Sequence, residues 1–326
     1  MKQKLLITGG AGFIGSVLTA YLLDNGYEVV VVDDLSTGHS KRLDSRAILI
    51  QASSLDKPAL VAALVGVNTV IHCAAKSLVE ESVSSPELYH QVNTEGTGVL
   101  LEAMKEVQVL NIIFSSTAAV YGDSKIQPIT ESSEIKPVNP YGKSKIEAEQ
   151  LISTFCSNGF AGITFRYFNV AGSYQSSTGQ LHIEDHKNET HLIPKILKNY
   201  MKNKEKSQVE IYGDNWPTKD GSCVRDYLHV LDLAHAHLLA LDALVAGENK
   251  VFNLGSGSGY SVFEVVNEIE NVVGGKLNKV VAPNRPGDPP VLLADIDKAR
   301  KELSWIPKAN LNQIVLDSWQ GAKQLG

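Results

Sequence analysis

The sequence has few cysteines and no long hydrophobic run. Its three cysteines, Cys73, Cys156 and Cys223, form no CxxC pair, so the sequence suggests neither a disulfide framework nor a cysteine-ligated zinc site. No run of about 18 apolar residues occurs, and the short apolar segment at residues 5–8 ends at two glycines. A signal peptide or membrane span is therefore not expected, and we predict a cytoplasmic protein with no membrane partner.

An excess of positive charge is also lacking. The 326 residues include 30 Lys and Arg against 36 Asp and Glu, a formal net charge of −6. Such a chain offers no broad basic surface for nucleic acid or an anionic membrane. We therefore expect no nucleic-acid partner, and we expect any anionic ligand to be held by a few local cations.

Apolar β-rich runs alternate with segments of helical periodicity through the first half of the chain. The runs occupy residues 4–10, 27–34, 47–51, 68–75, 111–117 and 162–169. Continuous apolar strands separated by helices are typical of a parallel sheet covered on both faces. The sequence thus predicts an α/β fold with a doubly wound, Rossmann-type parallel sheet.

The pattern changes after Gly172. Residues 173–191 are polar and without periodicity, which predicts a long loop of the kind that often covers a ligand. Helices and strands then resume, including an apolar run at residues 250–255. We predict one domain over residues 1–172 and a smaller α/β domain over 173–326, with some segments of the second returning to the first sheet.

The segment TGGAGFIG joins the first predicted strand to the first helix and places Gly9, Gly12 and Gly15 in a GxxGxxG pattern. In this context glycines and a helix N-terminus receive a pyrophosphate. The next strand ends at Asp33, 18 residues after Gly15. A carboxylate there accepts hydrogen bonds from ribose hydroxyls and repels a 2′-phosphate, so NAD is predicted rather than NADP. Asp34 adds a second negative charge.

Tyr141 and Lys145 lie one helical turn apart, so both project from the same helix face. A phenol with a pKa of about 10 is a poor base at neutral pH. A nearby ammonium and a positively charged nicotinamide would lower that pKa, which would make Tyr141 a general base for a sugar or alcohol hydroxyl. Thr117, at the end of the preceding strand, is placed to hydrogen-bond the same substrate oxygen.

Nine segments along the whole chain together resemble the extended short-chain dehydrogenase/reductase family: TGGAGFIG, NTVIHCAA, SSTAAVYG, NPYGKSK, RYFNVAG, ETHLIP, DGSCVRDYLHV, NLGSG and RPGDPP. The resemblance is strongest to members that interconvert UDP-glucose and UDP-galactose by transient oxidation at sugar C4 with bound NAD. It implies an isomerase of carbohydrate metabolism with catalytic residues Tyr141, Lys145 and Thr117. Residues 1–172 would then bind NAD and residues 173–326 the UDP-hexose.

The same resemblance implies the binding residues. For the cofactor it implies Gly9, Gly12, Phe13, Ile14, Gly15, Asp33, Asp34, Ser53, Ser54, Ala74, Ala75, Asn93, Ser115, Tyr141, Lys145 and Phe168. For the UDP-hexose it implies Thr117, Tyr141, Asn169, His191, Leu192, Tyr212, Arg225, Arg285, Asp288 and Leu292. The arginines suit a diphosphate because guanidinium groups pair with it bidentately. Helices near residues 86–106 and 141–158 resemble those that pair in family homodimers, which implies a homodimer.

Three positions depart from the family pattern. Ser53 stands where many members have an acidic residue that contacts adenine, and Thr117 stands where many have serine. Leu292 occupies the position of a gate for sugar size, where tyrosine would narrow the pocket. A leucine leaves room for an N-acetyl group, so the N-acetylhexosamine pair is a second expected substrate.

Other functions remain as alternatives. A nucleotide-sugar 4,6-dehydratase would use the same cofactor. The sequence pattern of such dehydratases, however, has acidic residues at the positions that resemble Ala118 and Ala119 of this chain. An NADPH-dependent reductase is disfavoured by Asp33. A regulator that binds NAD without turnover would typically lose Tyr141 or Lys145.

The histidines suggest no metal site. His235 and His237 lie two residues apart on a predicted helix and do not face one another. His72 falls within a buried strand, which favours a structural role.

Overall fold

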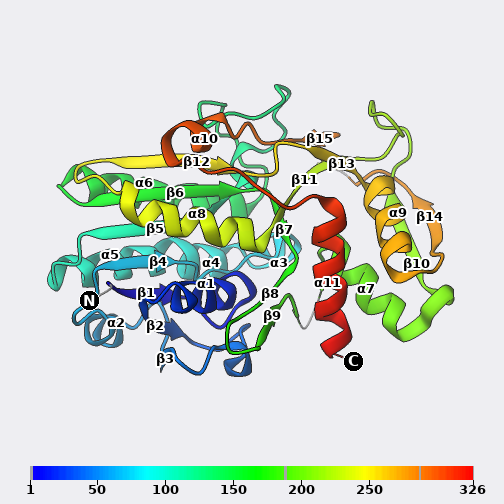
Figure 1. Cartoon of the computed structure of the whole chain (residues 1–326). Helices are drawn as coiled ribbons and strands as arrows, with labels where there is room; N and C mark the ends of the chain where they lie inside the picture. The colour runs from blue at the N-terminus through cyan, green and yellow to red at the C-terminus, as the bar shows by residue number, and fades with distance from the viewer. Residues whose placement is uncertain (1–2, 187–188, 286–287, 326) are drawn as a thin grey trace.

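The computed structural model describes residues 3–186, 189–285 and 288–325. A seven-stranded sheet with the order β12-β6-β5-β4-β1-β2-β3 dominates it, with helices on both faces (Figure 1). All its strands pair in parallel. They are β1 (Lys4–Thr8), β2 (Glu28–Asp33), β3 (Ile48–Gln51), β4 (Thr69–His72), β5 (Asn111–Thr117), β6 (Ala161–Tyr167) and β12 (Asn249–Leu254). The predicted doubly wound α/β fold is confirmed, with the switch in strand order between β1 and β4, where ligands bind at the carboxyl ends.

Both faces of the sheet are buried because successive strand side chains point to opposite sides. Leu5 and Ile7 of β1 join the core formed with α1 (Phe13–Asp24) and α8 (Val230–Ala243). Leu6 joins the opposite core, formed with α2 (Lys57–Ala63), α5 (Gly96–Glu106) and α6 (Pro140–Ser157). This double burial explains why the strands read as continuous apolar runs.

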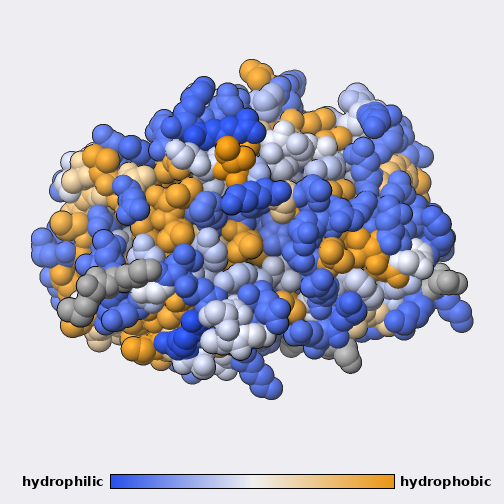
Figure 2. All heavy atoms as spheres, viewed as in Figure 1, coloured by the Kyte–Doolittle hydropathy of each residue, from blue (hydrophilic) through white to orange (hydrophobic). Residues whose placement is uncertain are grey.

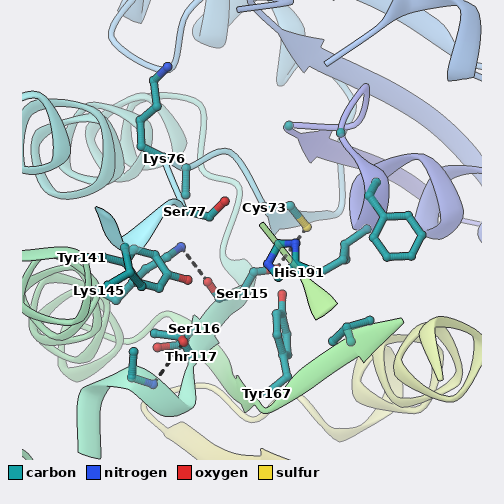
Figure 3. Close-up of a pocket in the computed structure, with 18 of the residues that line it drawn as sticks. Cys73, Lys76, Ser77, Ser115, Ser116, Thr117, Tyr141, Lys145, Tyr167 and His191 are labelled. Atoms are coloured by element: carbon teal, nitrogen blue, oxygen red, sulfur yellow. Dashed lines mark hydrogen bonds between the residues drawn. The ribbon is translucent and has the colours of Figure 1, made fainter. Parts of the chain in front are cut away.

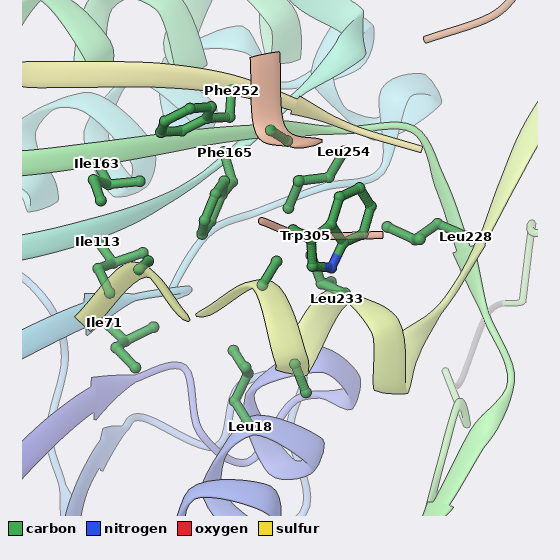
Figure 4. Packing of buried hydrophobic residues seen from close by; sticks show 14 of the residues in the cluster. Leu18, Ile71, Ile113, Ile163, Phe165, Leu228, Leu233, Phe252, Leu254 and Trp305 are labelled. Carbon is green, nitrogen blue, oxygen red and sulfur yellow. The ribbon is translucent and has the colours of Figure 1, made fainter. Parts of the chain in front are cut away.

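Trp305 closes the first of these cores. It is fully buried, and Figure 4 shows it beside Leu254 of β12 and Leu233 of α8. Its Nε1 donates a 2.9 Å hydrogen bond to the Asp232 carbonyl. A residue close to the C-terminal end of the sequence thus completes the core on one face of the seven-stranded sheet.

The second half of the chain contributes to both parts of the molecule. β12 pairs with β6, and α8 packs on α1, so this half supplies an edge strand of the seven-stranded sheet and a helix that covers it. The rest surrounds a separate core. Its elements are β7 (Asn169–Ala171), β10 (Gln208–Tyr212), β11 (Val224–His229), β13 (Gly259–Ser261), β14 (Asn278–Ala282), α7 (Leu192–Asn203), α9 (Val262–Val273) and α11 (Leu311–Leu325). In contrast, α10 (Asp297–Leu303) and Leu292 of β15 (Val291–Leu292) pack on the first core.

Short helices fill the connections. They are η1 (Ser40–Arg42), α3 (Val79–Ser84), α4 (Pro86–Tyr89), η2 (His90–Glu95), η3 (Ala118–Tyr121) and η4 (Lys204–Lys206). The helix predicted after Pro86 therefore forms as three successive pieces, α4, η2 and α5, in which η2 is a π-helix.

The prediction of an irregular loop over residues 173–191 was wrong in part. Strands β8 (Ser173–Gln175) and β9 (Leu181–Ile183) form an antiparallel hairpin that packs against α1 and α11. Each strand has only three residues, and buried positions include the polar Ser173 and His182. Such short polar strands produce no visible hydrophobic alternation.

Hydrophobic residues on the face shown in Figure 2 form separate patches among hydrophilic ones. Among the helices of the described ranges, none is long and apolar enough to cross a membrane.

Candidate active site

A cavity of about 740 Å³ opens at the carboxyl ends of the central strands. This volume lies within the range of small-molecule sites, about 300–1,000 Å³. Its walls come from the loop after β1, the segment after β4, the end of β5, the start of α6, and β11 and β15 of the second half. The strand edges and the second core therefore meet at one site.

The glycine loop shapes the cofactor end of this cavity. Gly9 has φ +70°, and a Cβ there would lie 2.6 Å from the Ala74 backbone nitrogen. A Cβ on Gly15 would collide with the Gly9 carbonyl oxygen. Gly12, the residue before α1, would meet only the Gly9 carbonyl oxygen, at 3.4 Å. Gly9 and Gly15 thus allow close backbone packing, and Gly12 leaves the N-terminus of α1 open to a phosphate.

Asp33 stands at the end of β2 beside this loop. Its Oδ2 accepts a hydrogen bond from the Ala11 N–H at 2.9 Å, and its Oδ1 accepts one from the Leu35 N–H at 2.8 Å. Burial raises the pKa of Asp33, and these hydrogen bonds oppose the rise. The carboxylate braces the glycine loop and faces the cavity, where it suits a ribose hydroxyl.

Tyr141 and Lys145 project together from α6 toward Ser115 and Thr117 of β5 (Figure 3). Asn139 caps α6 by accepting a 2.8 Å hydrogen bond from the Gly142 N–H. Lys145 is buried, and its Nζ donates a 2.8 Å hydrogen bond to the Ser115 carbonyl. Ser115, Thr117, Tyr141 and Lys145 all line the cavity. The three predicted catalytic residues therefore lie at one site.

Burial dominates the pKa values of Tyr141 and Lys145 in the protein itself. Burial raises the pKa of Tyr141, and a hydrogen bond with Thr117 lowers it only in part; the lowering predicted from the sequence required the positive charge of a bound nicotinamide as well. Burial also lowers the pKa of Lys145 to about 8. Desolvation, which has no signature in the residue spacing, outweighs the Thr117 hydrogen bond at Tyr141 and the nearby Cys73 and Glu149 at Lys145.

The predicted cofactor residues mostly line the cavity. Those that do so are Gly9, Gly12, Phe13, Ile14, Gly15, Asp33, Asp34, Ser54, Ala74, Ala75, Ser115, Tyr141, Lys145 and Phe168. Ser53 and Asn93 are outside this lining. Ser53 Oγ accepts from the Leu55 N–H, while buried Asn93 accepts from the Lys76 N–H at 2.8 Å and donates to its carbonyl at 3.0 Å. Asn93 therefore holds the cavity wall from behind.

The predicted substrate residues divide in the same way. Thr117, Tyr141, Asn169, His191, Leu192, Arg225, Asp288 and Leu292 line the cavity. The Arg225 guanidinium donates to the Pro289 carbonyl at 2.8 Å and lies 3.7 Å from Asp288 Oδ1. Tyr212 and Arg285 are outside the lining, and the Arg285 guanidinium lies over the Tyr212 ring at 3.8 Å from its centroid.

Several cavity residues escaped the sequence prediction. Lys76 and Ser77 follow β4, Tyr167 ends β6, and Glu184 and His186 follow β9. The hydroxyl oxygen of Tyr167 is buried without a hydrogen-bond partner. The rule that ligands bind at the carboxyl ends of parallel strands could have indicated Lys76 and Tyr167.

Comparison with known proteins agrees with this geometry. Residues 5–255 match the model of the NAD dependent epimerase/dehydratase family. A Corynebacterium glutamicum protein named UDP-glucose 4-epimerase is 44% identical over 326 residues, covering 99% of this chain and 97% of the relative.

Solved structures agree as well. A Stenotrophomonas maltophila UDP-glucose-4-epimerase with bound NAD and formylated UDP-arabinopyranose is similar, with a TM-score of 0.94, 32% identity, and coverage of 99% of this chain and 98% of that one. The UDP-Glc/GlcNAc 4-epimerase of Campylobacter jejuni has a TM-score of 0.85 and 36% identity, with 99% of both chains covered.

Proposed function

Because the chain belongs to the NAD dependent epimerase/dehydratase family, we propose that it interconverts UDP-glucose and UDP-galactose by transient oxidation at sugar C4 with NAD bound. The observation that carries the proposal is the group of Tyr141, Lys145 and Thr117 at the edge of the sheet. The Corynebacterium glutamicum relative, named for this activity, supports it.

The residues present fit NAD. The open Gly12 position and the N-terminus of α1 suit the pyrophosphate, and Asp33 suits the adenosine ribose. When bound, NAD supplies a reversible hydride acceptor and a positive charge at the nicotinamide ring. We assign residues 1–172 chiefly to this cofactor and residues 173–326 chiefly to the nucleotide sugar.

The side chains of the site handle the proton. Tyr141 takes the proton of the sugar 4-hydroxyl and returns it after the 4-keto sugar has turned its other face. Thr117 hydrogen-bonds the phenol, and the Lys145 ammonium, fixed on the Ser115 carbonyl, favours the phenolate. Arg225, beside the cavity, is placed to hold the diphosphate while the hexose turns.

The alternative reactions have less support. Ala118 and Ala119 line the cavity at the positions where a dehydratase needs proton-carrying side chains. Leu292 also lines it, and the Campylobacter jejuni relative is named for both UDP-Glc and GlcNAc substrates. We therefore propose the N-acetylhexosamine pair as a second substrate.

We also propose a cytoplasmic homodimer. The three cysteines are free, as expected in a reducing compartment. Leu88 and Leu151 are exposed on α4 and α6, within the two segments, 86–106 and 141–158, in which dimer helices are predicted. Apolar side chains on one helix group suit burial against a second copy.

The test is to incubate the purified protein, with no NAD added, with UDP-galactose and separately with UDP-N-acetylgalactosamine, and to follow the stereochemistry at C4 by proton NMR. Conversion of UDP-galactose to UDP-glucose is expected, together with conversion of the acetylated sugar. If neither sugar is converted even after NAD is supplied, the proposed function is wrong. If only UDP-galactose is converted, the N-acetylhexosamine proposal alone fails.

A further inference from the structure

Four potential metal ligands converge in the segment between β9 and α7. They are Glu184, His186, Glu189 and His191, and one ligand atom from each lies within 4.8 Å of the others. The proton chemistry proposed above uses none of them. His191 was predicted to contact substrate, but its Nδ1 lies 2.7 Å from Glu184 Oε1.

The separations match those of a tetrahedral site. His186 Nδ1 lies 3.4 Å from a carboxylate oxygen of Glu184 and 3.4 Å from one of Glu189. His191 Nδ1 lies 3.2 Å from a Glu189 oxygen. In tetrahedral zinc sites with bonds of about 2.0–2.1 Å, ligand atoms stand about 3.3–3.4 Å apart. Three of the four nitrogen–oxygen separations lie close to this value, and the 2.7 Å contact of His191 is shorter; the two separations to Glu189 involve its two different carboxylate oxygens, so one of these contacts must lengthen when a single oxygen binds the ion.

Hydrogen bonding alone leaves this cluster incomplete. His186 Nδ1 is buried and has no hydrogen-bond partner, although it lies between two carboxylates. The side chains of Glu184 and Glu189 are only 7% and 6% exposed. Two buried carboxylates placed together require positive charge between them, which the two imidazole rings supply when protonated and which a divalent cation would supply in place of those protons.

We propose that Glu184, His186, Glu189 and His191 bind a divalent transition metal, with Zn²⁺ the ion that their donor set fits best. Two imidazole nitrogens exclude a dedicated Ca²⁺ or Mg²⁺ site, because those ions take oxygen ligands. Four protein ligands leave no open position, which is characteristic of structural zinc. The inference rests on these four side chains and does not depend on the substrate.

The surrounding charges are compatible with a dication. Asp185 pairs with Arg42 at 2.8 Å and with Lys198 at 3.1 Å. Lys198 also lies 3.7 Å from a Glu189 oxygen, but it is held on Asp185 and the His186 carbonyl. The carboxylates of Glu184, Asp185 and Glu189 together with the cations of Arg42 and Lys198 carry one net negative charge. If a divalent ion replaces one proton on each of the two imidazolium rings, the total local charge does not change.

The position of the site indicates what the metal would do. Glu184 directly follows β9, and His191 directly precedes α7, whose first residue Leu192 lines the cavity. The ion would join the two ends of this segment and fix one wall of the substrate cavity. Its role is therefore structural, and removing it should lower thermal stability and raise the KM for the nucleotide sugar more than it lowers kcat.

The test measures zinc directly. Tag-free protein with its NAD is stripped with a chelator, dialysed against buffer containing ZnSO4 at low concentration, and analysed by mass spectrometry for metal per chain. We expect one zinc per chain and a higher melting temperature than in the stripped protein. The double variant His186→Gln/His191→Gln should bind zinc about 100-fold more weakly or worse, since changing a residue that merely orients a ligand already costs about 10- to 100-fold.

His90→Gln is the matched control. His90 also lies against two glutamates, Glu147 at 2.8 Å and Glu95 at 3.8 Å. The His90→Gln protein should still bind one zinc per chain. No saturable zinc in the wild type, or equal zinc in the double variant, would overturn the proposal. If the double variant does not fold, X-ray absorption at the zinc edge of the wild type decides: two nitrogen and two carboxylate ligands are expected, and any other set refutes the site. Epimerase activity is not the readout, so the two proposals fail separately.

Discussion

Burial governs the chemistry of individual side chains at this site. Lys145 is 3% exposed, and its Nζ lies 4.8 Å from the centroid of the Phe114 ring. Burial lowers its pKa to about 8 and raises that of Tyr141. The proton transfer proposed for Tyr141 would therefore depend on the positive charge that a bound nicotinamide adds.

Tyr141→Phe should lower kcat for epimerisation by about 10²- to 10⁴-fold, the usual contribution of a positioned general base. The NAD content should stay unchanged, because the change removes only the hydroxyl. Steady-state kinetics and the absorbance of released cofactor measure the two quantities. Tyr21→Phe is the control, since the Tyr21 hydroxyl hydrogen-bonds His235 away from the cavity. A Tyr141→Phe enzyme of normal kcat would show that another group is the base.

His72 should make stability sensitive to acid. Its ring is buried between the hydroxyls of Thr8 and Thr97, and burial, with a smaller effect of Lys145, lowers its pKa from 6.5 to about 3. Between these pH values the unfolded chain binds a proton that the folded chain excludes, so stability falls as pH drops below 6.5.

His72→Asn should therefore reduce the slope of unfolding free energy against pH between pH 4 and 6 by up to about 1.4 kcal/mol per pH unit. Denaturant titrations at several pH values measure this slope. His39→Asn, at an exposed position, should leave it unchanged. An unaltered slope in His72→Asn would show that the ring does not exclude the proton.

At the scale of elements, a buried polar network joins α6 to β5 and β6. The Glu149 carboxylate of α6 accepts hydrogen bonds from Ser116 Oγ and, at 3.0 Å, from Arg166 Nε. Arg166 donates in turn to the Tyr121 hydroxyl at 3.0 Å. The network lies directly behind Thr117 and fixes the helix that carries Tyr141.

Glu149→Ala should lower the free energy of unfolding by about 3–5 kcal/mol, because it leaves the buried Arg166 charge without its partner. Equilibrium denaturation in urea is the measurement. Glu106→Ala breaks only the exposed pair with Lys57 and should cost at most about 1 kcal/mol. Equal decreases in the free energy of unfolding of the two variants would contradict the claim that the Glu149–Arg166 pair matters more to stability because it is buried.

The elements that the sequence predicted well are those with strong periodic signals. The strands of the main sheet are buried on both faces, and Tyr141 and Lys145 occupy one helix at fixed spacing, so one-dimensional patterns describe them. The hairpin of β8 and β9 has no such pattern, and the side-chain cluster of Glu184, His186, Glu189 and His191 has none either. The position of Asn93 behind Lys76, and the stacking of Arg285 on Tyr212, are tertiary results without a local signal.

At the scale of the whole molecule, the exposed apolar residues predict how copies associate. Leu88 and Leu151 are 36% and 37% exposed on α4 and α6, which pack together. The wild type should sediment at twice its 35.3 kDa chain mass, and Leu88→Glu/Leu151→Glu should sediment as a monomer, because charges cannot be buried unpaired in an interface. Ile48→Glu, at a 61% exposed site on β3, should leave the mass unchanged. A dimeric double variant would place the interface elsewhere.

The pairing of β12 with β6 also has a consequence for biosynthesis. While residues 168–254 are still being translated, which takes roughly 4 to 17 seconds at about 5–20 residues per second, β6 lacks the neighbour that covers its edge. For most of this interval Ile163 and Phe165 also lack the α8 side chains of their core, and Trp305 of the same core is translated later still (Figure 4). The nascent chain thus presents an open strand edge and an apolar face at the ribosome, which are the features that chaperones recognise.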